Sequence, residues 1–166
     1  NLTAVNDHLF FSANDGMHGH ELWKTDGTEM GTQMVKDMTP GPAGSHGEHP
    51  FMFRIQNCTN VNGKLFFTAY QNNDYFVWKS DGTEAGTVPI APCYGFGIGS
   101  PVALFTEMNG NIYFFNEDVW GDDNFHLFKM DPDGGNIQAL ATFGLTDFYN
   151  SYDPQMVKVN NALYVA

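Results

Sequence analysis

The feature that most constrains this chain is a short motif that recurs at intervals of about fifty residues. Each copy is an aliphatic residue or Met, an Asn, a turn-forming residue, one variable residue and an apolar run. The copies occupy residues 5–11, 61–67, 108–114 and 159–165, which gives spacings of 56, 47 and 51 residues. A period of this length is typical of a repeat architecture, in which each unit buries its apolar faces against its neighbours.

A second motif keeps the same register. Residues 21–28 read ELWKTDGT, residues 76–83 read FVWKSDGT, and a diverged copy, HLFKMDPDG, occupies 126–134. In the first two copies a further Gly-Thr pair follows, at Gly31-Thr32 and Gly86-Thr87. Because two motifs hold one register, we treat the chain as a single repeat-built segment, 1–166. Its units are expected at 1–56, 57–107 and 108–158, with the start of a fourth at 159–166.

Each unit is expected to hold four antiparallel β-strands. Asn-Asp and Asn-Gly before an apolar run favour a tight hairpin turn, since these residues tolerate positive φ. In the second unit, a buried central strand over 65–69 is followed by strands around 76–79 and 87–90. No stretch has sustained helical periodicity. The predicted fold is therefore all-β, with propeller-type blades: about three blades plus one strand of a fourth, in an incomplete propeller.

Composition narrows the range of partners. Asp and Glu outnumber Lys and Arg by 19 to 7, which gives a formal charge of −12 at pH 7. This charge repels phosphate backbones, so nucleic acid is not an expected partner. No apolar stretch approaches the ~20 residues that span a bilayer, so no membrane span is expected. The sequence also lacks a nucleophile elbow and a phosphate-binding loop, and we expect no enzyme activity.

The segment ELWKTDGTEMGT at residues 21–32, followed by VKDMTPG at 35–41, resembles the ELWxxDGT repeat, which is known mainly from large secreted or surface proteins. Residues 1–6 and 9–13 resemble the strand that leads into that repeat. The likeness is close in the first unit, good in the second and loose in the third. The resemblance implies propeller-like blades and an extracellular or cell-surface scaffold, and it implies no reaction.

Two further features favour an extracellular setting. Asn1 and Asn57 each begin an N-x-Thr sequon, which makes them candidate glycosylation sites. Cys58 and Cys93 are an even number of cysteines, compatible with one disulfide that would pin the link after the second unit. The alternative is two buried free thiols.

Acidic loops offer two candidate calcium sites. Asp131, Asp133 and Asn136 form the loop that most resembles a calcium site, but it lacks the terminal Glu. A second acidic loop carries Asp122 and Asp123. Asp26, Asp81 and Asp131 recur at one repeat position, and their favoured interpretation is as turn residues whose carboxylates accept backbone hydrogen bonds.

Aromatic and histidine side chains also offer candidate sites. The tryptophans and the phenylalanine at one repeat position, Trp23, Trp78 and Phe128, are expected to pack between neighbouring blades. Trp120 lies in a polar loop, where its ring could stack on a sugar or fold back onto the blade. The six histidines lack the convergent spacing of a zinc site.

These observations favour a non-enzymatic extracellular structural or adhesion segment, within a filament or cell-surface assembly. Three blades do not close a ring, so the expected partners are other blades of a longer chain or copies of itself. One alternative is a lectin-like propeller that binds glycans through Trp120 and the acidic loops. Another is the non-catalytic part of a larger propeller enzyme.

Overall fold

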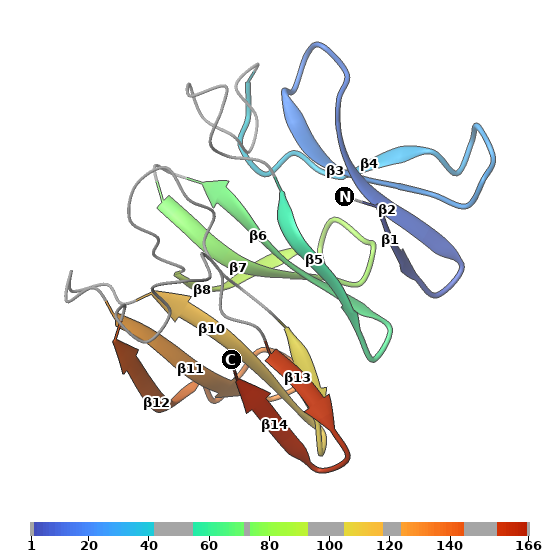
Figure 1. Cartoon of the computed structure of the whole chain (residues 1–166). Coiled ribbons are helices and arrows are strands. Elements are labelled where there is room, and N and C mark those ends of the chain that lie inside the picture. The colour runs from blue at the N-terminus through green and yellow to red at the C-terminus, as the bar shows by residue number, and fades with distance from the viewer. Residues whose placement is uncertain are drawn as a thin grey trace.

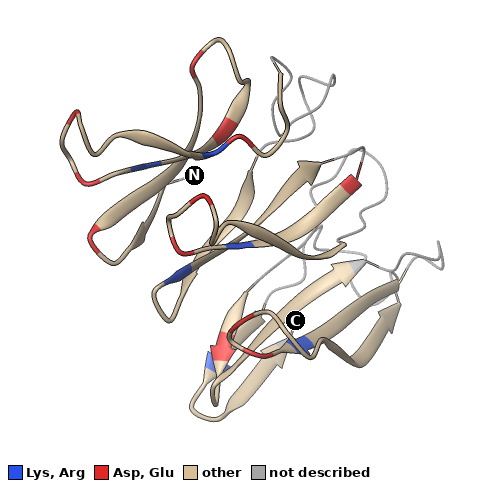
Figure 2. Ribbon diagram, turned by 180° about the vertical axis from the view of Figure 1, so that it is seen from behind, with Lys and Arg blue, Asp and Glu red and all other residues tan. Residues whose placement is uncertain are grey.

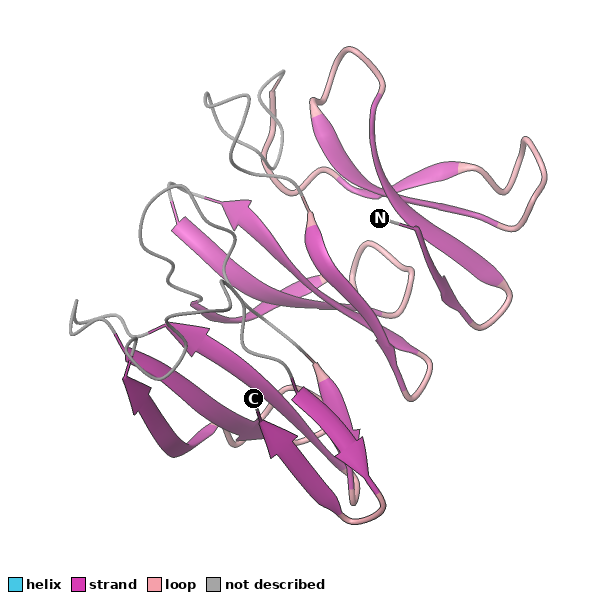
Figure 3. Cartoon of the chain, viewed as in Figure 1, coloured by secondary structure: helices cyan, strands magenta, loops and turns pink. Residues whose placement is uncertain are grey.

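A computed structural model gives the fold, and it describes residues 2–41, 55–71, 74–92, 105–117, 124–144 and 156–165. Throughout these ranges the chain forms strands and turns and no helix (Figure 3). The strands build three four-stranded antiparallel sheets and one two-stranded hairpin, which follow one another along the chain (Figure 1). The all-β prediction and the prediction of four antiparallel strands per unit are thus confirmed.

The sheets and the hairpin are named here by their strands. Sheet I contains β1 (Leu2–Val5), β2 (His8–Asn14), β3 (His20–Thr25) and β4 (Gln33–Lys36). Sheet II contains β5 (Gln56–Val61), β6 (Lys64–Gln71), β7 (Asp74–Ser80) and β8 (Val88–Pro92). Sheet III contains β9 (Thr106–Met108), β10 (Asn111–Glu117), β11 (Asn124–Met130) and β12 (Gln138–Gly144). The C-terminal hairpin contains β13 (Met156–Val159) and β14 (Ala162–Val165), and within every sheet the strands pair in chain order.

The Asn of the first motif makes the turn between the first two strands of each unit. Its φ is 51° at Asn6, 53° at Asn62, 53° at Asn109 and 54° at Asn160, a left-handed conformation that Asn adopts more readily than most residues. The fourth copy was expected to contribute one strand, but the structure contains two. The motif is a turn, so the strand before it pairs with the strand after it, from Val159 opposite Ala162 outwards.

Alternation of side chains gives each sheet two apolar faces. We call the face toward the preceding sheet the upstream face, and the face toward the following sheet the downstream face. In β6, Leu65 and Phe67 pack against sheet I, whereas Phe66 packs against sheet III. All three side chains have no exposed surface. A continuous apolar run is the pattern of a strand buried on both sides, as the sequence predicted.

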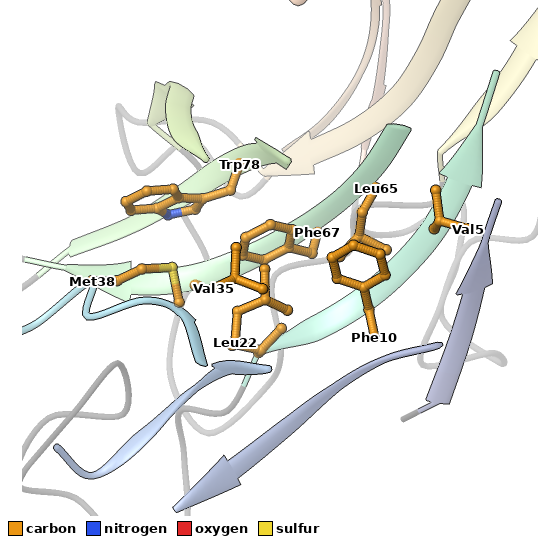
Figure 4. Packing of buried hydrophobic residues seen from close by; sticks show 10 residues of the cluster. Val5, Phe10, Leu22, Val35, Met38, Leu65, Phe67 and Trp78 are labelled. Atoms are coloured by element: carbon orange, nitrogen blue, oxygen red, sulfur yellow. The ribbon is translucent and has the colours of Figure 1, made fainter. Parts of the chain in front are cut away.

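Two apolar clusters join the three sheets. Between sheets I and II, the downstream face of one meets the upstream face of the other (Figure 4). The buried members of this first cluster are Val5, Phe10, Leu22, Val35, Met38, Ile55, Leu65, Phe67, Ala69 and Trp78. The second cluster joins sheets II and III through Val61, Phe66, Tyr75, Val77, Phe105, Ile112, Phe114 and Met130. Each sheet therefore gains its stability from contact with its neighbours in the chain.

Candidate functional site: a repeated turn and the lysines that join the sheets

The Asp-Gly-Thr turn links the third and fourth strands of sheets I and II. Oδ1 of Asp26 accepts a hydrogen bond from the Thr28 backbone N–H at 2.9 Å and another from Thr28 Oγ1 at 2.7 Å. Asp81 repeats this geometry with Thr83, at 2.8 and 2.7 Å. These bonds favour the ionised form and hold the pKa of both carboxyl groups below its usual range. Both aspartates are turn residues, as predicted.

Hydroxyl groups complete the turn in sheet II. Oγ1 of Thr83 accepts a hydrogen bond from the Gly86 N–H at 2.9 Å, and Thr87 Oγ1 donates to the Thr83 carbonyl at 2.7 Å. Ser80 Oγ lies 2.7 Å from Thr87 Oγ1 and accepts a bond from the Gly82 N–H at 3.0 Å. The same bonds occur in sheet I, where the corresponding residues are Thr25, Gly27, Thr28, Gly31 and Thr32. Each hydroxyl group of the motif therefore forms hydrogen bonds that stabilise the turn.

Two glycines in this turn are required for different reasons. Gly82 has a φ of 88°, a left-handed value that favours glycine. At Gly86 the constraint is space, because a Cβ atom there would lie 2.1 Å from Oδ1 of Asp81. In sheet I the Cβ position of Gly31 lies 1.9 Å from Oδ1 of Asp26. The motif Asp-Gly-Thr-x-x-Gly-Thr thus encodes one compact hydrogen-bonded unit.

A lysine on the downstream face of sheets I and II reaches the turn of the next sheet. Nζ of Lys24 donates to the Gly82 backbone carbonyl at 2.7 Å. Nζ of Lys79, at the same repeat position in sheet II, donates to the Asp133 carbonyl in the turn of sheet III. Both lysines follow the Trp of the second motif. This repeated lysine contact joins consecutive sheets through main-chain atoms of the turn.

Further polar contacts strengthen the same junctions. Nζ of Lys36 donates to the Thr87 carbonyl of sheet II at 2.9 Å. Lys64 forms an ion pair with Asp133 of sheet III, and this pair holds the pKa of the Asp133 carboxyl below its usual range. Figure 2 shows many of the acidic residues in turns and the lysines on strands. The few cations of this acidic chain are therefore used largely between sheets.

The first strands of consecutive units also touch. Nδ2 of Asn6 donates to the Gly63 carbonyl at 3.1 Å, and Nδ2 of Asn60 donates to the Ala4 carbonyl at 2.9 Å. The first bond joins the turn after β1 to the turn after β5, and the second joins β5 to β1. Between β9 and β13, Lys158 pairs with Glu107 at 3.1 Å.

The aromatic residues at the Trp position pack as the repeat predicts in two of the three units. Trp78 is fully buried and stacks on Phe67, with ring centroids 6.1 Å apart. Phe128 stacks on Phe114 at 5.4 Å on the upstream face of sheet III. Trp23 lies on the upstream face of sheet I and is only half-buried. In the described part of the chain, no sheet precedes sheet I to cover it.

The loop proposed as a calcium site is only partly assembled. Nδ2 of Asn136 donates to Oδ2 of Asp131 at 2.5 Å, so these two side chains come together. The Asp133 carboxylate instead faces Lys64. Within the described ranges, no group of three or more His, Cys, Asp or Glu side chains is placed to hold a metal ion. Calcium binding remains a prediction.

Several other candidate residues lie outside the described residues, namely Asn1, Cys93, Trp120, Asp122 and Asp123. Cys58 is a free thiol, and its pKa is raised to about 11 because it is largely buried. Because Cys93 lies outside the described residues, a disulfide between the two cysteines stays a prediction. Asn57 is half-buried in β5, and its Nδ2, the atom that would carry a glycan, donates to Thr68 Oγ1 at 3.2 Å.

The lysine contacts were not anticipated from the sequence. The available signal was the Lys that follows the aromatic residue in all three copies of the second motif, Lys24, Lys79 and Lys129.

The described residues contain no helix long and apolar enough to cross a membrane. Comparison with known protein families found no matching family model, and comparison with curated proteins found no significant match.

Proposed function

We propose that this chain is a non-enzymatic structural or adhesion segment of an extracellular or cell-surface assembly, built from propeller-type blades. The observation that carries the proposal is that the polar side chains of the repeat bind turns of the chain itself. The motif lysines Lys24 and Lys79 bind the turns of the next sheet, and the motif aspartate Asp81 is bound within its own turn. The lysines therefore join one unit to the next, and the aspartate stabilises the turn that the lysine of the preceding unit binds.

The arrangement of the sheets supports the propeller-type interpretation. Each sheet is a four-stranded meander, the unit from which propeller blades are made. The first strands of neighbouring units lie together, β1 beside β5 and β9 beside β13. In a propeller the first strands of the blades surround the central axis, so neighbouring first strands are close. The downstream face of each sheet packs on the upstream face of the next, as in stacked blades.

Sequence features support the extracellular part of the proposal. The two sequons at Asn1 and Asn57, the two cysteines and the resemblance to the ELWxxDGT repeat all favour a secreted or surface protein. A charge of −12 favours solubility and discourages non-specific association among like-charged surfaces.

Electron microscopy of the native material that contains this chain tests the proposal. We expect regular filaments or sheets in which the chain repeats, with glycan density at the sequons. Discrete closed particles that bind sugars in a glycan screen would overturn the structural interpretation in favour of a lectin.

A further inference from the structure

The upstream face of sheet I contains a hollow beside its Asp-Gly-Thr turn. Its volume is about 370 Å³. The residues that line it are Ala4, Asn6, Asp7, His8, Leu9, Thr25, Asp26 and Gly27. At Gly27 nothing lies within 4 Å of the Cβ position among the described residues, so the space next to this glycine is open.

The equivalent place in sheet II is filled by sheet I. A Cβ atom at Gly82, the counterpart of Gly27, would lie 3.1 Å from Cζ of Phe10 and 3.8 Å from Nζ of Lys24. A Cβ atom at Gly63 would lie 3.0 Å from Oδ1 of Asn6. In sheet II, the place that corresponds to the hollow is thus occupied by an aromatic ring and an Asn side chain from sheet I. In sheet I the same place is open.

The C-terminal hairpin carries the residues that fill such a site. Val159, Asn160 and Tyr164 stand at the repeat positions of Val5, Asn6 and Phe10. In sheet I, Val5 and Phe10 are each only 3% exposed, because sheet II covers them. On the hairpin, Val159 is 48% exposed and Tyr164 is 60% exposed.

We propose that two copies of this chain associate head to tail, with the hairpin of one copy stacked on the upstream face of sheet I of the next. The Tyr164 ring occupies the hollow beside Gly27, and the Asn160 amide donates to the Asp7 carbonyl, as Asn6 does to Gly63. The contact deepens the proposed function and rests on it for its biological setting. Because the two surfaces differ, the contact is heterologous and propagates into a linear array unless its rotation closes a ring.

A complementation experiment with the purified 166-residue chain tests this contact. Tyr164→Asp removes the ring and places a charge in the apolar interface, while leaving the hollow intact. Gly27→Asn fills the hollow with the side chain that best tolerates positive φ, while leaving the hairpin intact. In sedimentation velocity, the unaltered chain is expected to form oligomers that grow with concentration. Each variant alone should remain monomeric, with a dissociation constant raised by at least about tenfold.

A mixture of the two variants distinguishes a head-to-tail contact from other modes of association. The intact hairpin of Gly27→Asn still fits the intact hollow of Tyr164→Asp, so the mixture should yield dimers of one copy of each and nothing larger. Met17→Asp changes a side chain that is 73% exposed, and Gly16→Asn changes an open glycine with φ of 85°; both lie in the loop between β2 and β3, outside the turn that lines the hollow. Both controls should assemble like the unaltered chain, and circular dichroism should confirm that all four variants fold.

Three results would overturn the inference: an unaltered chain that stays monomeric, variants that assemble normally, or a mixture that yields no dimer. Failure here is separable from failure of the proposed function. If native material forms filaments while the purified chain remains monomeric, the head-to-tail contact is wrong and the structural role stands. If the complementary variants dimerise while native material consists of closed sugar-binding particles, the contact stands and the structural role is wrong.

Discussion

Replacing Gly86 by alanine tests whether the Asp-Gly-Thr turn depends on the space that this glycine leaves for a carboxylate. The new methyl group would lie 2.1 to 2.3 Å from the atoms of the Asp81 carboxylate. Contacts that short do not occur, so the carboxylate must leave its position. It then loses its hydrogen bonds from the Thr83 N–H and hydroxyl.

The cost follows from the bonds that are lost. A hydrogen bond contributes about 1 kcal/mol net to the free energy of unfolding. A charged acceptor usually gives more, but the Asp81 carboxylate is largely exposed, so solvent screening holds each of its bonds near that figure. Two bonds and a disturbed third, from Gly86 N–H to Thr83 Oγ1, give about 2–3 kcal/mol. Asp81→Ala removes the same two bonds and should cost about 2 kcal/mol. In the double variant the methyl group has no carboxylate to displace, so its cost should also be about 2 kcal/mol, well below the sum of the two single costs.

Urea denaturation followed by tryptophan fluorescence measures these free energies of unfolding, with the fully buried Trp78 as an internal reporter. Gly135→Ala is the matched control, since it changes a glycine of the diverged third turn where the nearest atom, Oδ2 of Asp131, lies 4.0 Å away. It should change the free energy of unfolding by less than about 0.5 kcal/mol. Strictly additive costs for Gly86→Ala and Asp81→Ala would refute the steric argument.

Three other measurements probe separate parts of the fold. Gly82→Ala should destabilise the chain by about 1–3 kcal/mol more than Gly27→Ala, because only the former meets a packed neighbouring sheet. With a pKa raised to about 11, the thiol of Cys58 in the reduced native chain should react with iodoacetamide at pH 8 about 100-fold more slowly than in urea. His18 should titrate by NMR at a pKa above that of a free histidine, because the Asp15 carboxylate accepts its ring N–H at 2.6 Å, and Asp15→Asn should abolish the shift.

For each of these three measurements, one result would contradict the prediction. Equal losses for the two Gly-to-Ala variants would mean that φ alone sets the cost. Rapid native labelling of Cys58 would contradict its burial. For His18 the sign is fixed by the raised pKa: the ion pair with Asp15 is present at low pH and is lost as the pH rises through the folded pKa. A pKa unchanged by Asp15→Asn would place the cause elsewhere.

Sequence pattern alone was enough for the sheets, because turn chemistry and burial act locally. Asn-Gly before an apolar run predicts a hairpin, and the run Leu65-Phe66-Phe67 predicts a strand covered on both sides. The role of Asp81 as a turn residue was predicted in the same way.

Contacts between units could not be predicted in that way. The bond from Lys24 to Gly82 joins residues 58 positions apart, and its existence depends on how two sheets stack. The hollow beside Gly27 is visible only by comparing equivalent glycines in three dimensions. The sequence also does not reveal that position 86 must be glycine for lack of space. The φ of Gly86 is not left-handed, and the atoms that a Cβ would meet belong to the Asp81 side chain, which folds back over the turn.

The lysine contact has a consequence for how such a chain tolerates change in its sequence. Lys24 and Lys79 both bind a main-chain carbonyl, an atom that every amino acid supplies. The acceptor turn reads Asp-Gly-Thr in sheet II but Asp-Pro-Asp-Gly in sheet III, and a lysine reaches both. The turn sequences of duplicated units can therefore diverge while the contact between neighbouring sheets is retained. The contact requires only the donor lysine and an unchanged path of the backbone in the turn.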